Sequence, residues 1–139
     1  MTEIDQLRQM QSLTKAQYER AQQSFQEIVA EETALRLELT RIDQMDRGTR
    51  GQPHDDIWIR AIGADLIWAE WVGRKRTQLN MQLARVLARK APHMAIVKKA
   101  YGEAMVVSEL LDERCRTKNH KAQNVVLSEI INQSVINSY

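Results

Sequence analysis

The amino-acid sequence predicts an all-α fold, a long antiparallel two-helix coiled-coil hairpin. Its 139 residues include 5 Gly and 2 Pro, and only 5% are aromatic, which suits long helices better than a globular core. Apolar residues recur at alternating spacings of three and four through the first 46 residues. A turn-like segment follows, and helix-forming residues then dominate again. The length corresponds to one domain.

The first predicted helix covers about residues 2–46, which contain no Gly and no Pro. Steps of three and four from Ile4 reach apolar residues at nine of thirteen positions. Such a repeat keeps one stripe on one side of a supercoiled helix. Near Gln11 and Thr14, Met10 and Leu13 offer a competing seam. The predicted coiled-coil seam consists of Ile4, Leu7, Tyr18, Ala21, Phe25, Ile28, Leu35, Leu39 and Ile42.

The predicted hairpin loop covers residues 47–56. Gly48, Gly51 and Pro53 provide the backbone freedom and the missing donor that turns use. Asp55 or Asp56 can then cap the second helix through a side-chain oxygen.

The second predicted helix covers about residues 57–115, and its apolar seam is less regular. A proline inside a helix costs about 3 kcal/mol, so we expect either a kink or a break near Pro92. Residues 116–139 end in the sequence VVLSEIINQSVINSY, which fits a last helical segment, a strand-like segment ordered by a partner, or a frayed end. If helical, this tail overhangs the first helix, and its apolar residues need a partner.

Charge is distributed unevenly along the chain. Residues 1–46 hold nine acidic and five basic residues, whereas residues 71–102 hold eight basic residues and no acidic one. This cationic segment is compatible with a solvated face, an acidic protein partner or nucleic acid. The net charge of +2 favours nucleic acid least. We expect the cations to neutralise the first helix in part and to leave surplus charge for an acidic protein.

Three tryptophans precede and enter the cationic segment. Either they pack against the first helix, or at least one contacts a partner, as Trp often does at interfaces. The candidate partner-binding residues are Trp58, Trp68, Trp71, Arg74, Lys75, Arg76, Arg85, Arg89, Lys98, Lys99 and Tyr101.

The sequence predicts a non-enzyme without a cofactor or metal. Its five glycines do not fit a phosphate-binding loop, and no His and Cys cluster matches a zinc site. Cys115 is the only cysteine, which is typical of a reducing compartment. The polar N-terminus and the lack of a run long enough to span a membrane lead us to expect a cytoplasmic protein.

Residues 98–116, KKAYGEAMVVSELLDERCR, resemble the FliJ/YscO family. In that family a basic residue, an alanine-like residue and an aromatic residue precede a charged and apolar run that ends in a Leu-containing heptad. The matching positions here are Lys99, Ala100, Tyr101, Glu103, Glu109 and Leu110.

The resemblance implies a coiled-coil stalk of a type III export apparatus, in flagellar assembly or virulence secretion. It implies that both termini dock in the hexameric export ATPase, the tail together with residues 4–13, and that the loop end reaches the export gate. Export chaperones are a further implied partner, and the protein would be peripheral at the inner membrane through these partners. The rival readings are a generic coiled-coil scaffold of phage or cell-envelope origin and a nucleic-acid-binding hairpin that uses the segment from Arg74 to Lys99.

Overall fold

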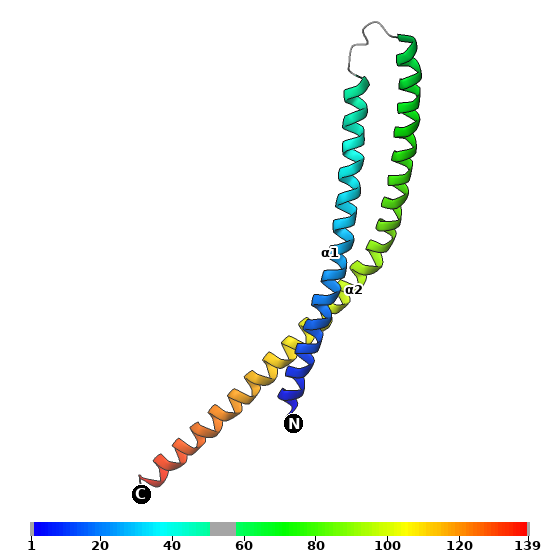
Figure 1. Ribbon diagram of the computed structural model, residues 1–139. Coiled ribbons are helices and arrows are strands. Elements are labelled where there is room, and N and C mark those ends of the chain that lie inside the picture. The colour runs from blue at the N-terminus through cyan, green and yellow to red at the C-terminus, as the bar shows by residue number, and fades with distance from the viewer. Residues whose placement is uncertain (1, 51–57, 139) are drawn as a thin grey trace. The chain divides into compact units, whose positions relative to one another are not determined.

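The chain forms two long α-helices that pack antiparallel as a helical hairpin (Figure 1). The computed structural model describes residues 2–50 and 58–138. α1 is Glu3–Arg50 and α2 is Trp58–Ile136. The predicted fold class is therefore confirmed. The turn predicted at Gly51 and Pro53 and the caps predicted at Asp55 and Asp56 lie outside the described residues.

A capping box begins α1. The backbone N–H of Asp5 donates to Thr2 Oγ1 at 3.2 Å, while Thr2 Oγ1 and the Thr2 backbone N–H donate to Asp5 Oδ2 at 2.6 and 3.3 Å. This reciprocal arrangement satisfies donors that a helix start otherwise leaves free. The Thr2 hydroxyl is the main reason that the pKa of Asp5 lies below its ordinary value.

α1 is longer than predicted, because it continues through Gly48 to Arg50 instead of ending at residue 46. One glycine inside a helix costs only about 1 kcal/mol relative to alanine. The Thr49 hydroxyl also donates to the Met45 carbonyl at 2.9 Å. Gly48 is thus a helical residue and not part of the loop.

α2 is also longer than predicted, because it passes through Pro92 without interruption and reaches Ile136. Of the two alternatives expected at Pro92, a break does not occur, whereas a kink stays a prediction. Pro92 is exposed, so water can reach the backbone carbonyl that its missing N–H leaves free. Of the alternatives for the tail, the structure has the helical one.

Packing divides the chain into two compact units. The middle unit is Gln22–Ile96, and the terminal unit combines Met1–Ala21 with Val97–Tyr139. Each unit contains one stretch of α1 and one of α2.

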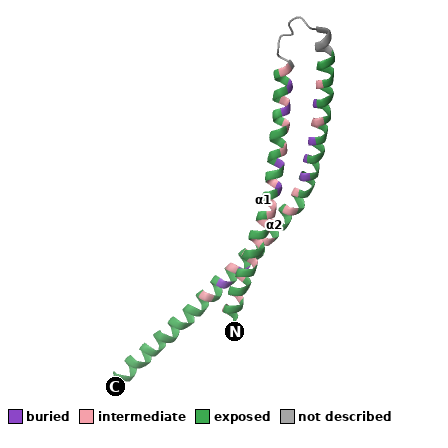
Figure 2. Cartoon of the chain, in the orientation of Figure 1, coloured by how far each residue is buried: buried purple, intermediate pink, exposed green. Residues whose placement is uncertain are grey.

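The non-exposed stripe of α1 coincides with the predicted seam (Figure 2). All thirteen positions of the three- and four-residue stepping are buried or half-buried. The stripe includes Gln11 and Thr14, whereas Met10 and Leu13 of the competing seam are exposed. Spacing therefore determines this stripe more strictly than residue type does.

The seam of α2 is more regular than its apolar residues indicate. Polar residues occupy some of its positions, which is why the apolar pattern alone looked irregular. From Arg76 to Leu111, steps of three and four reach only non-exposed positions: Arg76, Leu79, Leu83, Val86, Lys90, His93, Val97, Ala100, Ala104, Val107 and Leu111. Ser108 beside Val107 is the one further non-exposed residue of this stretch.

Candidate protein-binding surfaces

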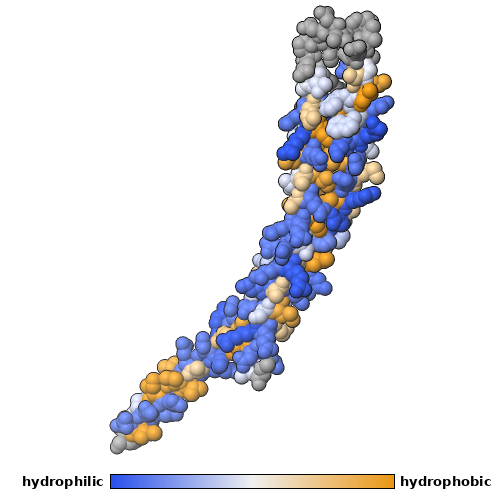
Figure 3. All heavy atoms as spheres, viewed as in Figure 1, coloured by the Kyte–Doolittle hydropathy of each residue, from blue (hydrophilic) through white to orange (hydrophobic). Residues whose placement is uncertain are grey.

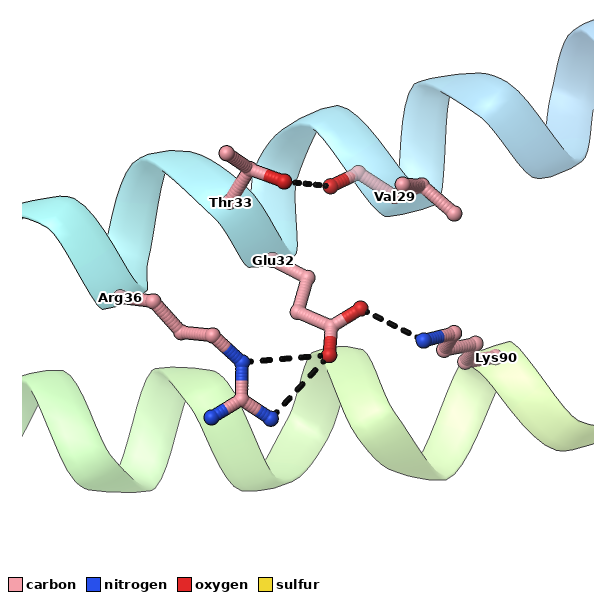
Figure 4. Close-up of polar contacts among 5 residues, drawn as sticks. All are labelled: Val29, Glu32, Thr33, Arg36 and Lys90. Atoms are coloured by element: carbon pink, nitrogen blue, oxygen red, sulfur yellow. Dashed lines mark hydrogen bonds and ion pairs between the residues drawn. The ribbon is translucent and has the colours of Figure 1, made fainter.

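A polar layer crosses the seam of the middle unit at Glu32, which is buried. Lys90 Nζ donates to Glu32 Oε2 at 2.7 Å, and Arg36 donates to Oε1 from Nε and Nη2 at 3.2 and 3.1 Å (Figure 4). Both carboxylate oxygens are thus satisfied. The bond from Lys90 is the main reason that the pKa of Glu32 lies below its ordinary value of 4.5.

Three other cations of α2 pair with acidic residues of α1 in the same unit. Arg76 Nη2 lies 2.6 Å from Asp43 Oδ1 and 4.0 Å from Asp46 Oδ2. The other two ion pairs are Lys75 with Glu38 and Arg89 with Glu31. Half of the eight cations in residues 71–102 therefore bind α1, as the charge asymmetry led us to expect.

The remaining cations of this segment are Arg74, Arg85, Lys98 and Lys99. All four are exposed, and none forms an ion pair with a described residue. Ion pairs within the described hairpin therefore do not neutralise the charges of these four residues.

Arg74 and Arg85 belong to an exposed stripe on the middle unit. We call it the outer stripe, and it consists of Ile67, Trp71, Arg74, Gln78, Met81 and Arg85. Because these residues follow one another at steps of four and three, they share one face of α2. The face contains large apolar and aromatic groups and two guanidinium groups that pair with no described residue, and the exposed carboxylate of Glu70 borders it one turn before Arg74. Near its end, Arg85 also lines an open groove with Ala34, Leu35, Val86 and Ala88.

The two described tryptophan side chains divide between the core and the outer stripe. Trp68 packs against the core cluster of Ile42, Val72 and Leu79. The Trp71 ring stacks on it at a centroid distance of 5.3 Å but remains 42% exposed. The third candidate, Trp58, begins α2, but its side chain lies outside the described part. Trp71 is therefore the described tryptophan that a partner can reach most readily.

Tyr101 belongs to the terminal unit, where it contacts the other helix. Its ring lies 5.4 Å from that of Tyr18, and Gln11 Nε2 donates to Ser108 Oγ at 3.2 Å. From the Gln11–Ser108 contact to the Tyr18–Tyr101 contact, the chain advances by seven residues on α1 and goes back by seven on α2, as antiparallel packing requires. Half of Tyr101 is exposed, so its helix contact does not exclude a partner.

A second exposed surface is the terminal segment, which we define as residues 117–138. Glu3, the first residue of α1, pairs with Arg114 at 3.2 Å, and no described residue of α1 covers α2 farther along. Every described residue after Cys115 is exposed. The exposed large aliphatic residues of the terminal segment are Val125, Val126, Leu127, Ile130, Ile131, Val135 and Ile136 (Figure 3).

Within residues 2–50 and 58–138 no group of three or more His, Cys, Asp or Glu residues is placed to hold a metal ion. None of the described helices has an apolar stretch sufficient to cross a bilayer. What the two surfaces present is exposed apolar area, and on the outer stripe positive charge as well.

Three members of the outer stripe, Ile67, Gln78 and Met81, were not among the sequence-based candidates. Their signal is the same three- and four-residue spacing that identifies a seam, displaced to another face of the helix. A seam is recognised in a sequence by its apolar residues, so a stripe that mixes Ile, Trp, Gln, Met and Arg is not recognised by its composition.

Comparison with known proteins adds no relative. The chain has no significant match to a protein-family model, to a curated protein or to a solved structure.

Proposed function

We propose that this protein is a non-catalytic helical-hairpin adaptor whose outer stripe binds an acidic protein surface. The observation that carries this proposal is the division of the cations. Those that face α1 are already paired, while Arg74 and Arg85 lie unpaired beside Trp71 and Met81 on an exposed face.

The composition of the outer stripe supports a protein partner. Trp, Arg and Met are enriched at protein interfaces, and Trp and Arg are frequent hot-spot residues. An exposed Trp next to unpaired Arg residues provides an apolar anchor and bidentate donors for carboxylates. Six residues along one helix face fit an amphipathic partner helix that carries acidic residues at its edges.

The balance of exposed and buried apolar residues supports the adaptor class. Among the described residues, eight hydrophobic side chains are buried and 22 large hydrophobic ones are exposed. A helical hairpin has one seam, and here it is already filled. Exposed apolar groups that gather on a face beyond the seam usually mark association with other molecules.

The resemblance of residues 98–116 to the FliJ/YscO family supplies the more specific proposal. The adaptor is then the stalk of a type III export apparatus, and its partners are the export ATPase and the export gate, with export chaperones as further partners. Its place is the cytoplasmic side of the inner membrane, where it is held through these proteins.

The test uses the full chain with the export ATPase and the cytoplasmic part of the export-gate protein from the same genome. Pull-down measures binding to each, and the ATP hydrolysis rate is measured with and without the chain. We expect binding to at least one partner and a change in hydrolysis rate. The double variant Trp71→Ala/Arg74→Glu should weaken binding by at least about tenfold, since hot-spot residues carry about 2 kcal/mol or more each.

The matched control is Arg41→Glu, which makes the same charge change at an exposed position of α1 in the same unit. It should leave binding nearly unchanged. If neither export protein binds but acidic proteins are held through the outer stripe, the adaptor class survives and the export role fails. A salt-dependent shift of labelled DNA that Arg74→Glu abolishes would instead favour the nucleic-acid reading. If the two variants weaken partner binding equally, the outer stripe is not the docking surface.

A further inference from the structure

The terminal segment of α2 has the composition of a helix that another helix covers. Between residues 122 and 138 Glu129 is the sole charged residue, while seven large aliphatic residues are exposed. Helices without a partner are marginal in water at this length, the more so with β-branched residues. A helix of this kind is expected to bury its apolar residues against a partner.

Four of the aliphatic residues form one compact face. At 3.6 residues per turn, Val126, Leu127, Ile130 and Ile131 lie together on two successive turns, and each is more than half exposed. Val125 and Ile136 lie on the opposite side of the helix. We call the group of four the aliphatic face.

Uncharged polar residues flank the aliphatic face in both directions. Gln123 lies one turn before it and Ser134 one turn after it, while His120 and Asn137 lie one turn farther out. The Ser134 hydroxyl donates to the Ile131 carbonyl at 2.7 Å. Because this hydroxyl is satisfied within its own helix, covering it costs little.

This pattern reads the same in both directions. An antiparallel copy of the helix places Val126 opposite Ile131 and Leu127 opposite Ile130, while Gln123 meets Ser134. A surface that complements itself in this way is what a two-fold symmetric interface requires, because each residue pair then occurs twice. No charge lies on the aliphatic face, so pairing brings no like charges together there.

The charges next to the aliphatic face favour the antiparallel direction. Lys118 and Lys121 precede it within about two turns, whereas residues 130–138 carry no charge. A parallel pair would align these two bases with the same two bases of the other copy. An antiparallel pair places them beside the uncharged end of the partner helix, and it also opposes the two helix dipoles.

We propose that the aliphatic face pairs antiparallel with the same face of a second copy of this chain. The interface contains eight aliphatic side chains at its centre and uncharged polar residues at both ends. It uses no residue of the outer stripe, so the proposed adaptor function and this self-association stand or fall separately.

Analytical ultracentrifugation of the full chain over a range of concentrations tests the proposal. We expect a concentration-dependent dimer of the 16.1 kDa chain. Leu127→Glu/Ile130→Glu should weaken the dimer at least tenfold, because it places four carboxylates in the centre of the interface. Val125→Glu introduces a carboxylate on the opposite side and should leave the dimer intact. Trp71→Ala should also leave it intact.

Cysteine crosslinking tests the direction of pairing. In a Cys115→Ser background, a mixture of Gln123→Cys and Ser134→Cys chains should form a disulfide between unlike copies, since these positions face each other. Gln123→Cys alone should not crosslink, because its two copies are separated by about 16 Å along the axis at 1.5 Å per residue. Efficient crosslinking of Gln123→Cys with itself would overturn the antiparallel arrangement. A monomer at all concentrations, or a dimer that Leu127→Glu/Ile130→Glu does not weaken, would overturn the proposal as a whole.

Discussion

The middle unit and the terminal segment contain parts of the same helix, α2, yet they are held in different ways. In the middle unit, α2 buries Val72, Leu79 and Val86, and its paired cations bind acidic residues of α1. In the terminal segment every described residue is exposed, and from residue 122 to residue 138 Glu129 is the sole charged residue. One stretch of α2 has its partner within the chain, and the other presents the residues that a partner would cover.

This difference shows that apolar content alone does not identify the core of a hairpin. The terminal segment has more large aliphatic residues per turn than the middle unit, but none of them is buried. Burial follows the seam positions at which α1 and α2 face each other, and on α1 these include Glu32 and Asp46. Where the second helix has no neighbour, a dense aliphatic sequence is a surface instead of a core.

The largest effect that tests this contrast comes from matched leucine substitutions. Leu79→Ala removes a side chain that is only 2% exposed and should lower the free energy of unfolding by about 2–4 kcal/mol, because a cavity remains in the seam. Leu127→Ala, at a position that is 56% exposed, should change it by less than about 0.5 kcal/mol in the monomer. Urea unfolding followed by far-UV circular dichroism at low protein concentration measures both. Similar losses for the two variants would contradict the division into seam and surface.

A second contrast separates the cations that face α1 from those of the outer stripe. Arg76→Met should lower the free energy of unfolding by about 1 kcal/mol, because it leaves Asp43 and Asp46 without this partner. Arg74→Met should change it by less than about 0.5 kcal/mol, since Arg74 makes no ion pair with a described residue. The same urea experiment at two salt concentrations measures these values, and the effect of Arg76→Met should shrink at high salt. If Arg74→Met lowered the free energy of unfolding as much as Arg76→Met does, the outer stripe would stabilise the folded hairpin.

The sequence predicts the hairpin and the α1 seam because both depend on spacing. A run without Gly or Pro and a 3.5-residue repeat leave few alternatives for residues 3–46, and even polar Gln11 and Thr14 lie where the repeat places them. The excess of acidic residues on one helix and of basic residues on the other likewise predicts that ion pairs join the two helices, although it does not predict which residues form them. Long side chains at these positions bring their charge to the edge of the seam while their stems lie along it.

The sequence does not determine which cation faces which way. Arg74, Lys75 and Arg76 are adjacent, so each points in a different direction around the helix, and only the phase of the α2 seam decides among them. That phase is obscured by Lys90 and His93, which occupy seam positions without being apolar. The sequence also does not show that α2 continues through Pro92, because a proline is tolerated there only on an exposed face.

The smallest effect concerns the Glu32 layer and its dependence on pH. The pKa of Glu32 in the folded chain lies below its ordinary value of 4.5, chiefly because Lys90 donates to it. The unfolded chain therefore takes up a proton at a higher pH than the folded chain does. The contribution of this layer to stability is fully present above about pH 4.5 and is lost as pH falls through the folded pKa.

Unfolding experiments between pH 7 and pH 3 on the wild type and on Glu32→Gln measure this contribution. At pH 7 the variant should be less stable, because Lys90 and Arg36 lose a charged acceptor. The difference between the two proteins should shrink as pH falls below about 4.5, since the unfolded wild type then takes up a proton and the folded carboxylate becomes neutral once pH passes its lowered pKa. Glu129→Gln removes an exposed carboxylate of the terminal segment that pairs with no described residue, and it should match the wild type throughout. A Glu32→Gln difference that stays constant down to pH 3 would show that the side-chain shape of Glu32, and not its charge, stabilises this part of the seam.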